Sequence, residues 1–222
     1  MNPSSFKKKI MPTLRINEIF YSIQGESSRI GRPTVFVRLT GCPMRCTYCD
    51  TAYAFHDGQQ QEIDEIIQEI QKFDTNYVTV TGGEPLAQKN CIELMNQLCA
   101  LGYQVSLETG GGLDIKDVNS QVKIILDVKT PKSNEDKNNF WPNLANIKTT
   151  DEIKFVIQDY DDFSWSIDII KQYQLNQRQI LFSPVYRVLA SEQLAEWILK
   201  YQLNVRLQLQ LHKILWGEKQ GV

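Results

Sequence analysis

The chain lacks the features that mark membrane proteins, disulfide-stabilised proteins and nucleic-acid-binding proteins. Its 222 residues carry a formal net charge of −2, so no excess of positive charge favours binding to nucleic acid or an anionic membrane. No apolar run approaches the ~20 residues that a membrane-spanning helix requires. The five cysteines are an odd number and no signal peptide opens the sequence, so a disulfide framework is not expected. These absences predict a soluble cytoplasmic protein that acts on a small molecule.

Strand-like and helix-like segments alternate along a chain of ordinary globular composition, with 42% hydrophobic and 23% charged residues. Strands are predicted at residues 34–39, 77–80, 104–107, 122–128, 152–157, 179–182 and 204–209. Helices are predicted at residues 62–73, 88–101, 163–173 and 191–201. This alternation predicts an α/β fold with a mainly parallel sheet, in which the helices form right-handed crossovers. Functional loops are then expected at the carboxyl ends of the strands.

The predicted sheet is too small for a closed barrel. A complete eight-stranded barrel typically takes ~250 residues, and no clear helix follows residues 122–128. The polar stretch 131–150 is predicted to be a long surface loop. We therefore predict an incomplete, open barrel of the TIM type. Residues 1–222 are expected to form a single domain, because no second domain or internal repeat is visible, with residues 1–12 as a flexible amino-terminal tail.

Three closely spaced cysteines follow the first of these predicted strands. Cys42, Cys46 and Cys49 are separated by three and then two residues. Three thiolates at this spacing can bind three corners of a cubic iron–sulfur cluster, which leaves the fourth iron without a protein ligand. An iron with an open position can take a substrate or a cofactor. The spacing therefore indicates chemistry rather than electron storage.

Other readings of the cysteines stay open. A zinc site with these three cysteines would need a fourth ligand, and His56 is near enough in sequence to supply it. Such a site would make the chain a zinc-binding adaptor rather than an enzyme. Cys91 and Cys99 fall on the apolar stripe of a predicted helix, so they are expected to be small core residues.

The cysteine spacing, with Tyr48 directly before the last cysteine, resembles the signature of the radical S-adenosylmethionine (SAM) superfamily. In that superfamily the open iron chelates SAM, and reductive cleavage gives a 5′-deoxyadenosyl radical. The segment Gly82-Gly83-Glu84-Pro85 follows a predicted strand and looks like the superfamily segment that holds the amino end of SAM. The SAM contacts implied by the resemblance are Tyr48, Asp50, Gly82, Gly83, Glu84, Glu108, Thr109, Lys129 and Ser183.

A narrower resemblance rests on motifs spread over most of the chain. The segments Ser22-Ile23-Gln24-Gly25-Glu26 and Cys49-Asp50-Thr51, with the glycine segment above, resemble the 7-carboxy-7-deazaguanine synthase family of the queuosine pathway. The resemblance implies a carbon–nitrogen lyase that converts 6-carboxy-5,6,7,8-tetrahydropterin to 7-carboxy-7-deazaguanine. The C6 hydrogen is removed, the pterin ring contracts, ammonia leaves and SAM is regenerated.

The same resemblance implies a substrate site and further cofactors. The substrate contacts are expected to be Ile23, Gln24, Gly25, Glu26, Arg38 and Thr81. Among them, Arg38 can pair with the substrate carboxylate through two charge-assisted hydrogen bonds. The hydroxyl of Thr51 is expected to help bind Mg²⁺, a hard cation that prefers oxygen ligands.

Partners and alternatives complete the interpretation. The resemblance implies an electron donor such as flavodoxin or ferredoxin, and a homodimer. Small radical SAM activases that generate a glycyl radical on a partner protein share the cysteine spacing and the glycine segment, so that class stays open. For His212 and Lys213, which follow the last predicted strand, a structural role and a place near the site are both open.

Overall fold

The computed structural model describes residues 11–222, so most of the tail expected at residues 1–12 lies outside the described residues. The strands are β1 (Thr13–Ile23), β2 (Pro33–Leu39), β3 (Gln59–Glu62), β4 (Tyr77–Gly82), β5 (Gln104–Thr109), β6 (Lys123–Val128), β7 (Glu152–Ile157), β8 (Gln179–Pro184) and β9 (Arg206–Leu207). The helices are α1 (Ile63–Ile70), α2 (Cys91–Ala100), α3 (Asn143–Asn146), α4 (Tyr160–Gln172), α5 (Ser191–Lys200) and α6 (Leu211–Trp216). None of these helices has the length and apolarity of a membrane span.

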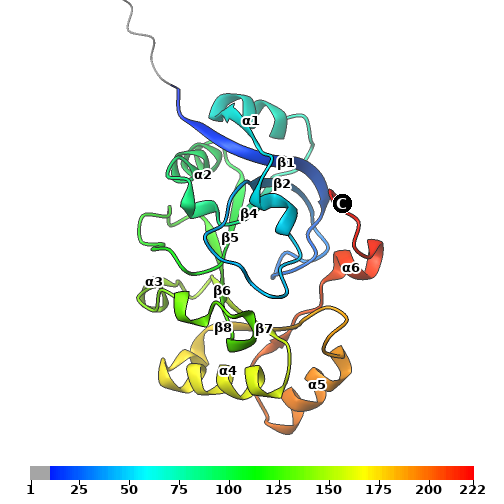
Figure 1. Cartoon of the computed structure of the whole chain (residues 1–222). Helices are drawn as coiled ribbons and strands as arrows, with labels where there is room; N and C mark the ends of the chain where they lie inside the picture. Colours follow the sequence, from blue (N-terminus) through cyan, green and yellow to red (C-terminus); the bar gives the residue numbers. More distant parts are fainter. Residues whose placement is uncertain (1–10) are drawn as a thin grey trace, which may run out of the picture.

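All nine strands form one sheet in the order β3-β1-β2-β4-β5-β6-β7-β8-β9. Strands β2 and β4 to β9 run parallel, whereas β1 pairs antiparallel with both β2 and β3. The edge strands β3 and β9 do not pair with each other in the described part of the chain, so the sheet is open. The predicted open, mainly parallel α/β sheet is confirmed (Figure 1).

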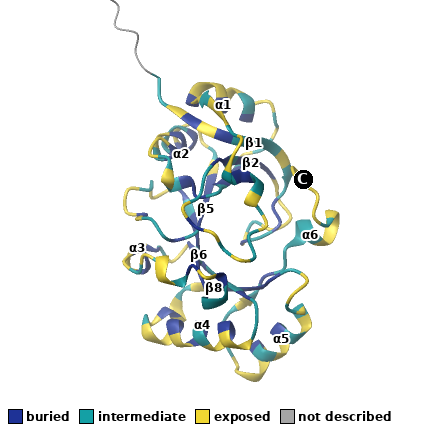
Figure 2. Cartoon of the chain, viewed as in Figure 1, coloured by how far each residue is buried: buried dark blue, intermediate teal, exposed yellow. Residues whose placement is uncertain are grey.

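The outward faces of the strands are apolar and carry the hydrophobic core. Near β1, β2, β4 and β5, this face packs against α1 and α2; near β6, β7 and β8, it packs against α4 and α5. Figure 2 shows the buried strands in the interior and the helices at the periphery, with the outer sides of the helices exposed. Cys91 and Cys99 belong to the first of these two core clusters, which confirms their expected role.

The inward faces of the same strands are polar. Thr79, Ser106, Glu108, Asp127 and Lys154 alternate with the apolar outward residues of β4 to β7. Because successive side chains of a strand point to opposite faces, these polar side chains share the inside of the curved sheet. The interior therefore holds a cavity of about 720 Å³ instead of a packed apolar core.

The open side of the sheet is bridged by segments outside the strands. After β1, residues 24–32 pass across the inside of the sheet, where Gln24 contacts Thr79 and Glu108 and the Ser28 amide donates to Glu152. The Leu211 amide of α6 donates to the Gly25 carbonyl at 2.9 Å, which joins the end of the chain to this crossing segment. In Figure 1, α6 (red) lies beside the blue strands that begin the chain.

Three sequence predictions were incomplete or wrong. Strands β1 and β3 and helix α6 were not predicted; in β1, a register shift between Ile16 and Glu18 breaks the alternation that signals a strand. Only Arg206–Leu207 of the predicted strand 204–209 is extended in the sheet. The polar stretch 131–150 is not a loose surface loop. It contains two 3₁₀ turns and α3, and Ser133 and Glu135 within it are 0% and 8% exposed because they form internal hydrogen bonds.

Candidate active site

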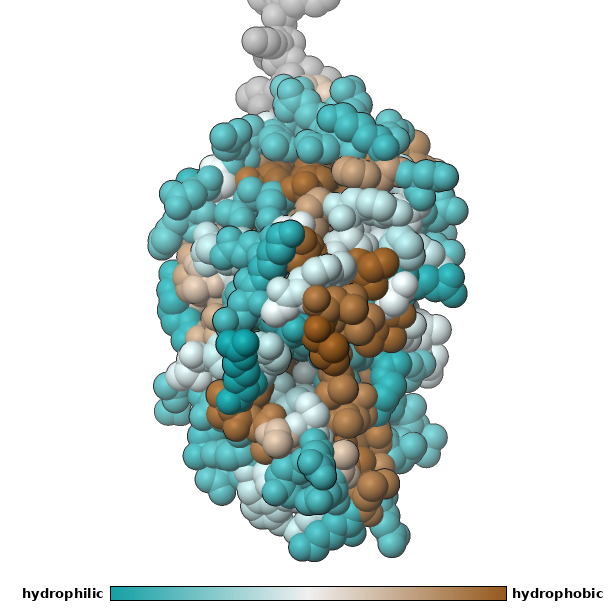
Figure 3. All heavy atoms as spheres, turned by 90° about the vertical axis from the view of Figure 1, so that its right-hand side faces the viewer, coloured by the Kyte–Doolittle hydropathy of each residue, from teal (hydrophilic) through white to brown (hydrophobic). Residues whose placement is uncertain are grey.

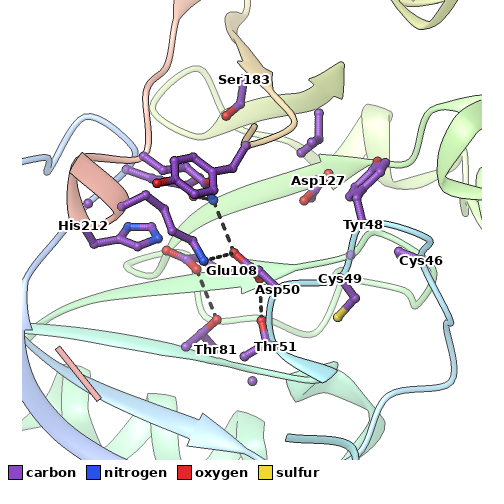
Figure 4. A pocket seen from close by; sticks show the side chains of 18 of the residues that line it. Cys46, Tyr48, Cys49, Asp50, Thr51, Thr81, Glu108, Asp127, Ser183 and His212 are labelled. Carbon is purple, nitrogen blue, oxygen red and sulfur yellow. Dashed lines mark hydrogen bonds and ion pairs between the residues drawn. The ribbon is translucent and has the colours of Figure 1, made fainter. Parts of the chain in front are cut away.

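The cavity opens at the carboxyl ends of the parallel strands, where functional loops were expected. The predicted site residues that line it are Ile23, Gln24, Gly25, Glu26, Arg38, Cys42, Cys46, Tyr48, Cys49, Asp50, Thr51, Thr81, Gly82, Gly83, Glu108, Thr109, Lys129 and Ser183. In Figure 4, Cys46, Cys49 and Tyr48 lie on one side of the pocket and His212 on the other, with Asp50, Thr51 and Glu108 between them. The structure thus brings the predicted cluster, SAM and substrate residues into one cavity.

The cysteine loop (residues 40–50) connects β2 to this cavity. Cys42, Cys46 and Cys49 are free thiols, each partly exposed. Burial raises the pKa of Cys46 to about 11, and burial also raises the pKa of Cys42 and Cys49. The metal-free thiols are therefore protonated at neutral pH, and metal binding must release their protons.

The donor set fits an iron–sulfur cluster better than one zinc ion. Three soft sulfur donors lie in one cavity, as a cluster with one open iron requires. Across residues 11–222, no three or more His, Cys, Asp and Glu side chains are grouped to hold a single metal ion. His56, which the alternative zinc site would need as its fourth ligand, is not among the residues that line the cavity.

The glycine segment after β4 lies directly against the cysteine loop. A Cβ atom on Gly83 would collide with the Gly41 carbonyl, and one on Gly82 would collide with Leu39. Gly82 also has φ of 142°, which side chains rarely permit. Only glycines therefore allow the predicted SAM segment to approach the cysteine loop this closely.

Glu84 lies outside the cavity lining, unlike the other predicted site residues. It is 0% exposed, and its carboxylate accepts hydrogen bonds from the Leu86 amide, the Thr109 hydroxyl and the Gly110 amide. In this geometry the side chain joins the loops that follow β4 and β5. Any contact of this carboxylate with SAM remains a prediction.

Arg38 is held on one edge and open on the other. Its Nε donates to Glu18 at 2.7 Å, and the Tyr53 hydroxyl donates to the same carboxylate oxygen at 2.8 Å. The rings of Phe20 and Tyr53 lie 5.5 and 5.7 Å from the guanidinium carbon. This fixes the guanidinium, whose Nη groups have no protein acceptor among the described residues, and Arg38 is one of the residues that line the cavity. They are suited to bind an anionic ligand.

A buried ion network forms another wall of the cavity. The Lys154 ammonium lies 3.0 Å from Glu26 and 3.4 Å from Asp127, and Asp127 is also 3.1 Å from the Lys129 ammonium. Burial alone would lower the pKa of Lys154, but the surrounding carboxylates raise it well above its ordinary value. Lys154 lies in β7 and lines the cavity, but it was not among the predicted site residues.

Gln24 and Glu108 meet at the centre of the cavity. The Gln24 amide donates to Thr79 at 3.1 Å and to Glu108 at 3.3 Å, while the Thr81 hydroxyl donates to Glu108 at 3.1 Å. Burial and the nearby Glu26 carboxylate raise the pKa of Glu108. The structure therefore groups Glu108, a predicted SAM contact, with residues predicted to bind the substrate.

Asp50 and Thr51 present oxygen atoms between these two sides of the cavity. The Thr51 hydroxyl donates to Asp50 at 2.7 Å, which leaves its lone pairs available. A hydroxyl beside a carboxylate is a suitable donor set for Mg²⁺, which keeps much of its water shell.

The carboxyl-terminal segment completes the cavity. His212 and Lys213 both line it, so they do approach the site. A Cβ atom on Gly25 would collide with the His212 ring, so Gly25 is required where the two segments cross. Residues 218–222 line the cavity as well. No sequence pattern pointed to them.

This combination of an open, mainly parallel sheet and a three-cysteine loop defines the class of protein. The sequence profile of the radical SAM superfamily matches residues 36–181. The chain therefore belongs to the radical SAM superfamily. A [4Fe–4S] cluster and SAM are the cofactors that this superfamily implies.

Individual relatives show which family within the superfamily the chain belongs to. A 7-carboxy-7-deazaguanine synthase of Chlorobaculum tepidum is 44% identical over 208 residues, covering 92% of this chain and 94% of that protein. A protein of the same name from Koribacter versatilis is 40% identical over 226 residues, covering 94% and 100%. Within the superfamily, the chain belongs to the 7-carboxy-7-deazaguanine synthases.

The fold agrees with a solved structure. The crystal structure of QueE from Escherichia coli matches with a TM-score of 0.77 at 21% identity, covering 90% of this chain and 95% of that one. At this identity the match supports the fold, and the sequence relatives carry the family.

Proposed function

We propose that this protein converts 6-carboxy-5,6,7,8-tetrahydropterin to 7-carboxy-7-deazaguanine and ammonia, for queuosine biosynthesis. The observation that carries the proposal is one cavity that is lined both by the three cysteines and by Gln24, Glu26, Arg38 and Glu108. Family membership supports the same reaction. Cys42, Cys46 and Cys49 would hold the cluster, which together with SAM would supply the radical chemistry for removal of the C6 hydrogen of the pterin.

Two parts of the cavity wall suit the two ends of the substrate, its carboxylate and its pterin ring. The open edge of Arg38 pairs with the substrate carboxylate. Gln24, Glu26 and Glu108 hydrogen-bond the polar edge of the pterin ring, because amide and carboxyl groups there already converge. Together these contacts aim C6 toward the cysteine side and exclude competing hydrogen donors.

SAM is proposed to bind between the cluster and the substrate. The peptide groups of Gly82 and Gly83, and the side chains of Lys129 and Ser183, line that part of the cavity with Tyr48 and Thr109. In the same proposal, Thr51 binds Mg²⁺ near the substrate carboxylate. Replacing Thr51 with Ala should change the Mg²⁺ concentration needed for half-maximal turnover; an unchanged requirement would remove Thr51 from the metal site.

Residues 1–222 are proposed to act as one domain and to pair as a homodimer that takes electrons from flavodoxin or ferredoxin. An apolar area on the face that carries α6 supports the dimer (Figure 3). Within α6, Ile214 and Leu215 are 64% and 52% exposed. Light scattering should give twice the chain mass; a single chain mass would refute the homodimer.

The decisive experiment is anaerobic turnover of the reconstituted protein with SAM, reductant, Mg²⁺ and the carboxytetrahydropterin, read by mass spectrometry. We expect 7-carboxy-7-deazaguanine with SAM recovered. Cleavage of SAM without that product would keep the superfamily and discard the substrate, as a glycyl-radical activase would require. Zinc at one equivalent without acid-labile sulfide would overturn the enzyme proposal altogether.

A further inference from the structure

The segment that follows β6 lies directly against the cysteine loop. The Arg45 amide donates to the Glu135 carboxylate at 2.5 Å. Two residues later, the Thr47 amide donates to the Ser133 carbonyl at 3.1 Å, and the Thr47 hydroxyl donates to the Lys132 carbonyl at 2.6 Å. Three hydrogen bonds thus hold the short stretch on either side of Cys46, and none of them involves a cysteine.

This segment, residues 130–139, is itself rigidly organised. The Ser133 hydroxyl donates to the Thr130 carbonyl at 2.6 Å and accepts from the Glu135 amide at 3.1 Å. The second carboxylate oxygen of Glu135 accepts from the Asn138 amide group. Both oxygens of Glu135 are therefore occupied by donors. Only an acceptor-only carboxylate serves both, since glutamine would turn a donor toward one of them.

A second wall holds the cysteine loop from another side. The Met44 side chain packs against Gly110 and Gly112, and a Cβ atom on Gly110 would collide with its terminal methyl group. Met44 is accordingly only 4% exposed. The Phe140 amide donates to the Gly111 carbonyl at 3.0 Å, which joins this wall to the end of the 130–139 segment.

The same segment also fixes a residue that faces the cavity. The Asn139 side chain accepts from the Lys129 amide and donates to the Lys129 carbonyl, both at 2.9 Å. This double contact sets the backbone of Lys129, whose ammonium pairs with Asp127 at 3.1 Å. One segment thus positions both the cysteine loop and a proposed SAM contact.

We propose that residues 130–139 preset the cysteine loop for cluster binding, and that Glu135 is the positioning residue on which this depends. The inference rests on the proposed function, because it requires that the three cysteines hold a cluster. Without the Glu135 contact, the loop around Cys46 would lose one of the three hydrogen bonds that hold it and would sample more conformations. Partners that orient metal ligands in this way typically change metal affinity by roughly 10-fold to 100-fold when they are removed.

Glu135→Ala tests the proposal, with Asp136→Ala as its matched control. Asp136 is the next residue, in the same turn, and its carboxylate makes no hydrogen bond or ion pair among the described residues, so the control removes the same charge without the contact. After anaerobic reconstitution of the full chain, iron release to a chelator should be roughly 10-fold faster for Glu135→Ala, while Asp136→Ala matches the original protein. Equal release from Glu135→Ala and the original protein would overturn the proposal.

A second readout needs no cluster. Trypsin can cleave after Arg45, and Glu135 holds the Arg45 amide, on the other side of this residue from the bond that is cut. In metal-free protein, Glu135→Ala should be cut at Arg45 severalfold faster than Asp136→Ala; equal rates would contradict the proposed restraint. If Glu135→Ala does not fold, Glu135→Met, which keeps the length of the side chain but offers Arg45 no acceptor oxygen, provides the same comparison. Failure of the original protein to bind iron and sulfide would instead refute the proposed function.

Discussion

The two faces of the parallel strands differ in chemical character: the outer face is apolar and the inner face is polar. On the outer face of β7, Ile153, Phe155 and Ile157 are all 0% exposed and pack under α4 and α5. On the inner face of the same strand, Glu152 and Lys154 form ion pairs with four residues from three other segments. Stability should therefore reside outside the curved sheet and chemistry inside it. The predictions below test that division.

The largest effect is expected for an inner cysteine. Cys46→Ala should abolish the visible absorbance of the cluster and all SAM cleavage, because one of three iron ligands is lost. The matched outer variant, Cys99→Ala, removes a sulfur packed in the core at 9% exposure. It should keep both signals. Loss of the cluster in Cys99→Ala would break the division between the two faces.

An outer-face variant should affect stability alone. Phe155 is fully buried and contacts the Phe182 ring edge-on at 5.6 Å. Phe155→Ala should lower the free energy of unfolding by about 3–5 kcal/mol through lost burial and a cavity. Urea denaturation measures the loss, and SAM cleavage per bound cluster should stay unchanged. The next residue, Val156, lines the cavity. Val156→Ala should therefore change SAM cleavage per bound cluster and leave the free energy of unfolding nearly unchanged.

Arg38→Ala should sharpen the comparison within the inner face. Removing charge-assisted hydrogen bonds worth about 1.5–3 kcal/mol should raise KM for the pterin roughly 10-fold to 100-fold. Cluster content and SAM cleavage without substrate should be retained, because the side-chain contacts of Arg38 are with Glu18, Phe20 and Tyr53 and not with the cysteines. Arg38→Lys should recover only part of the affinity, since lysine lacks the planar fork. Cluster loss in Arg38→Ala would refute the assignment.

The smallest effect concerns His212. Burial lowers its pKa below the ordinary value of 6.5, so the unfolded chain binds a proton more readily than the folded one. Its contribution to stability is therefore complete above pH 6.5 and is lost as the pH falls through the lowered value. His212→Asn should flatten the decline in the urea midpoint between about pH 7 and pH 5. An identical decline in both proteins would show that the imidazole is not desolvated.

The sequence predicted the outer face far better than the inner one. Apolar periodicity located α1, α2, α4 and α5 and most parallel strands, because burial under a helix imposes a regular pattern. The cysteine loop and the glycine segment were predicted because the spacing of their residues reflects the groups that they are expected to bind. Lys154 carries no such signal, since a single lysine in a strand looks the same whether it faces solvent or a cavity.

The loop around Glu135 was mispredicted for a related reason. Its polar composition suggested solvent exposure, but Glu135 is buried because its carboxylate accepts from the Arg45 amide of the cysteine loop, and Ser133 is buried because its hydroxyl bonds backbone groups of its own segment. Such pairings join residues 90 positions apart, so no local pattern reveals them. Glu84 shows the opposite case: the motif was recognised, yet its carboxylate turns toward the loops that it connects.

The crossing of residues 24–32 over the inside of the sheet also fixes the order in which the site can form. Gln24 contacts Glu108 from 84 residues away, and Glu26 contacts Lys154 and Gln210 from 128 and 184 residues away. Contacts this distant in sequence form slowly, because a long loop must close first. During synthesis, the earliest residues of the site must therefore wait for nearly the whole chain. A nascent chain can build its outer core well before it can recognise its substrate.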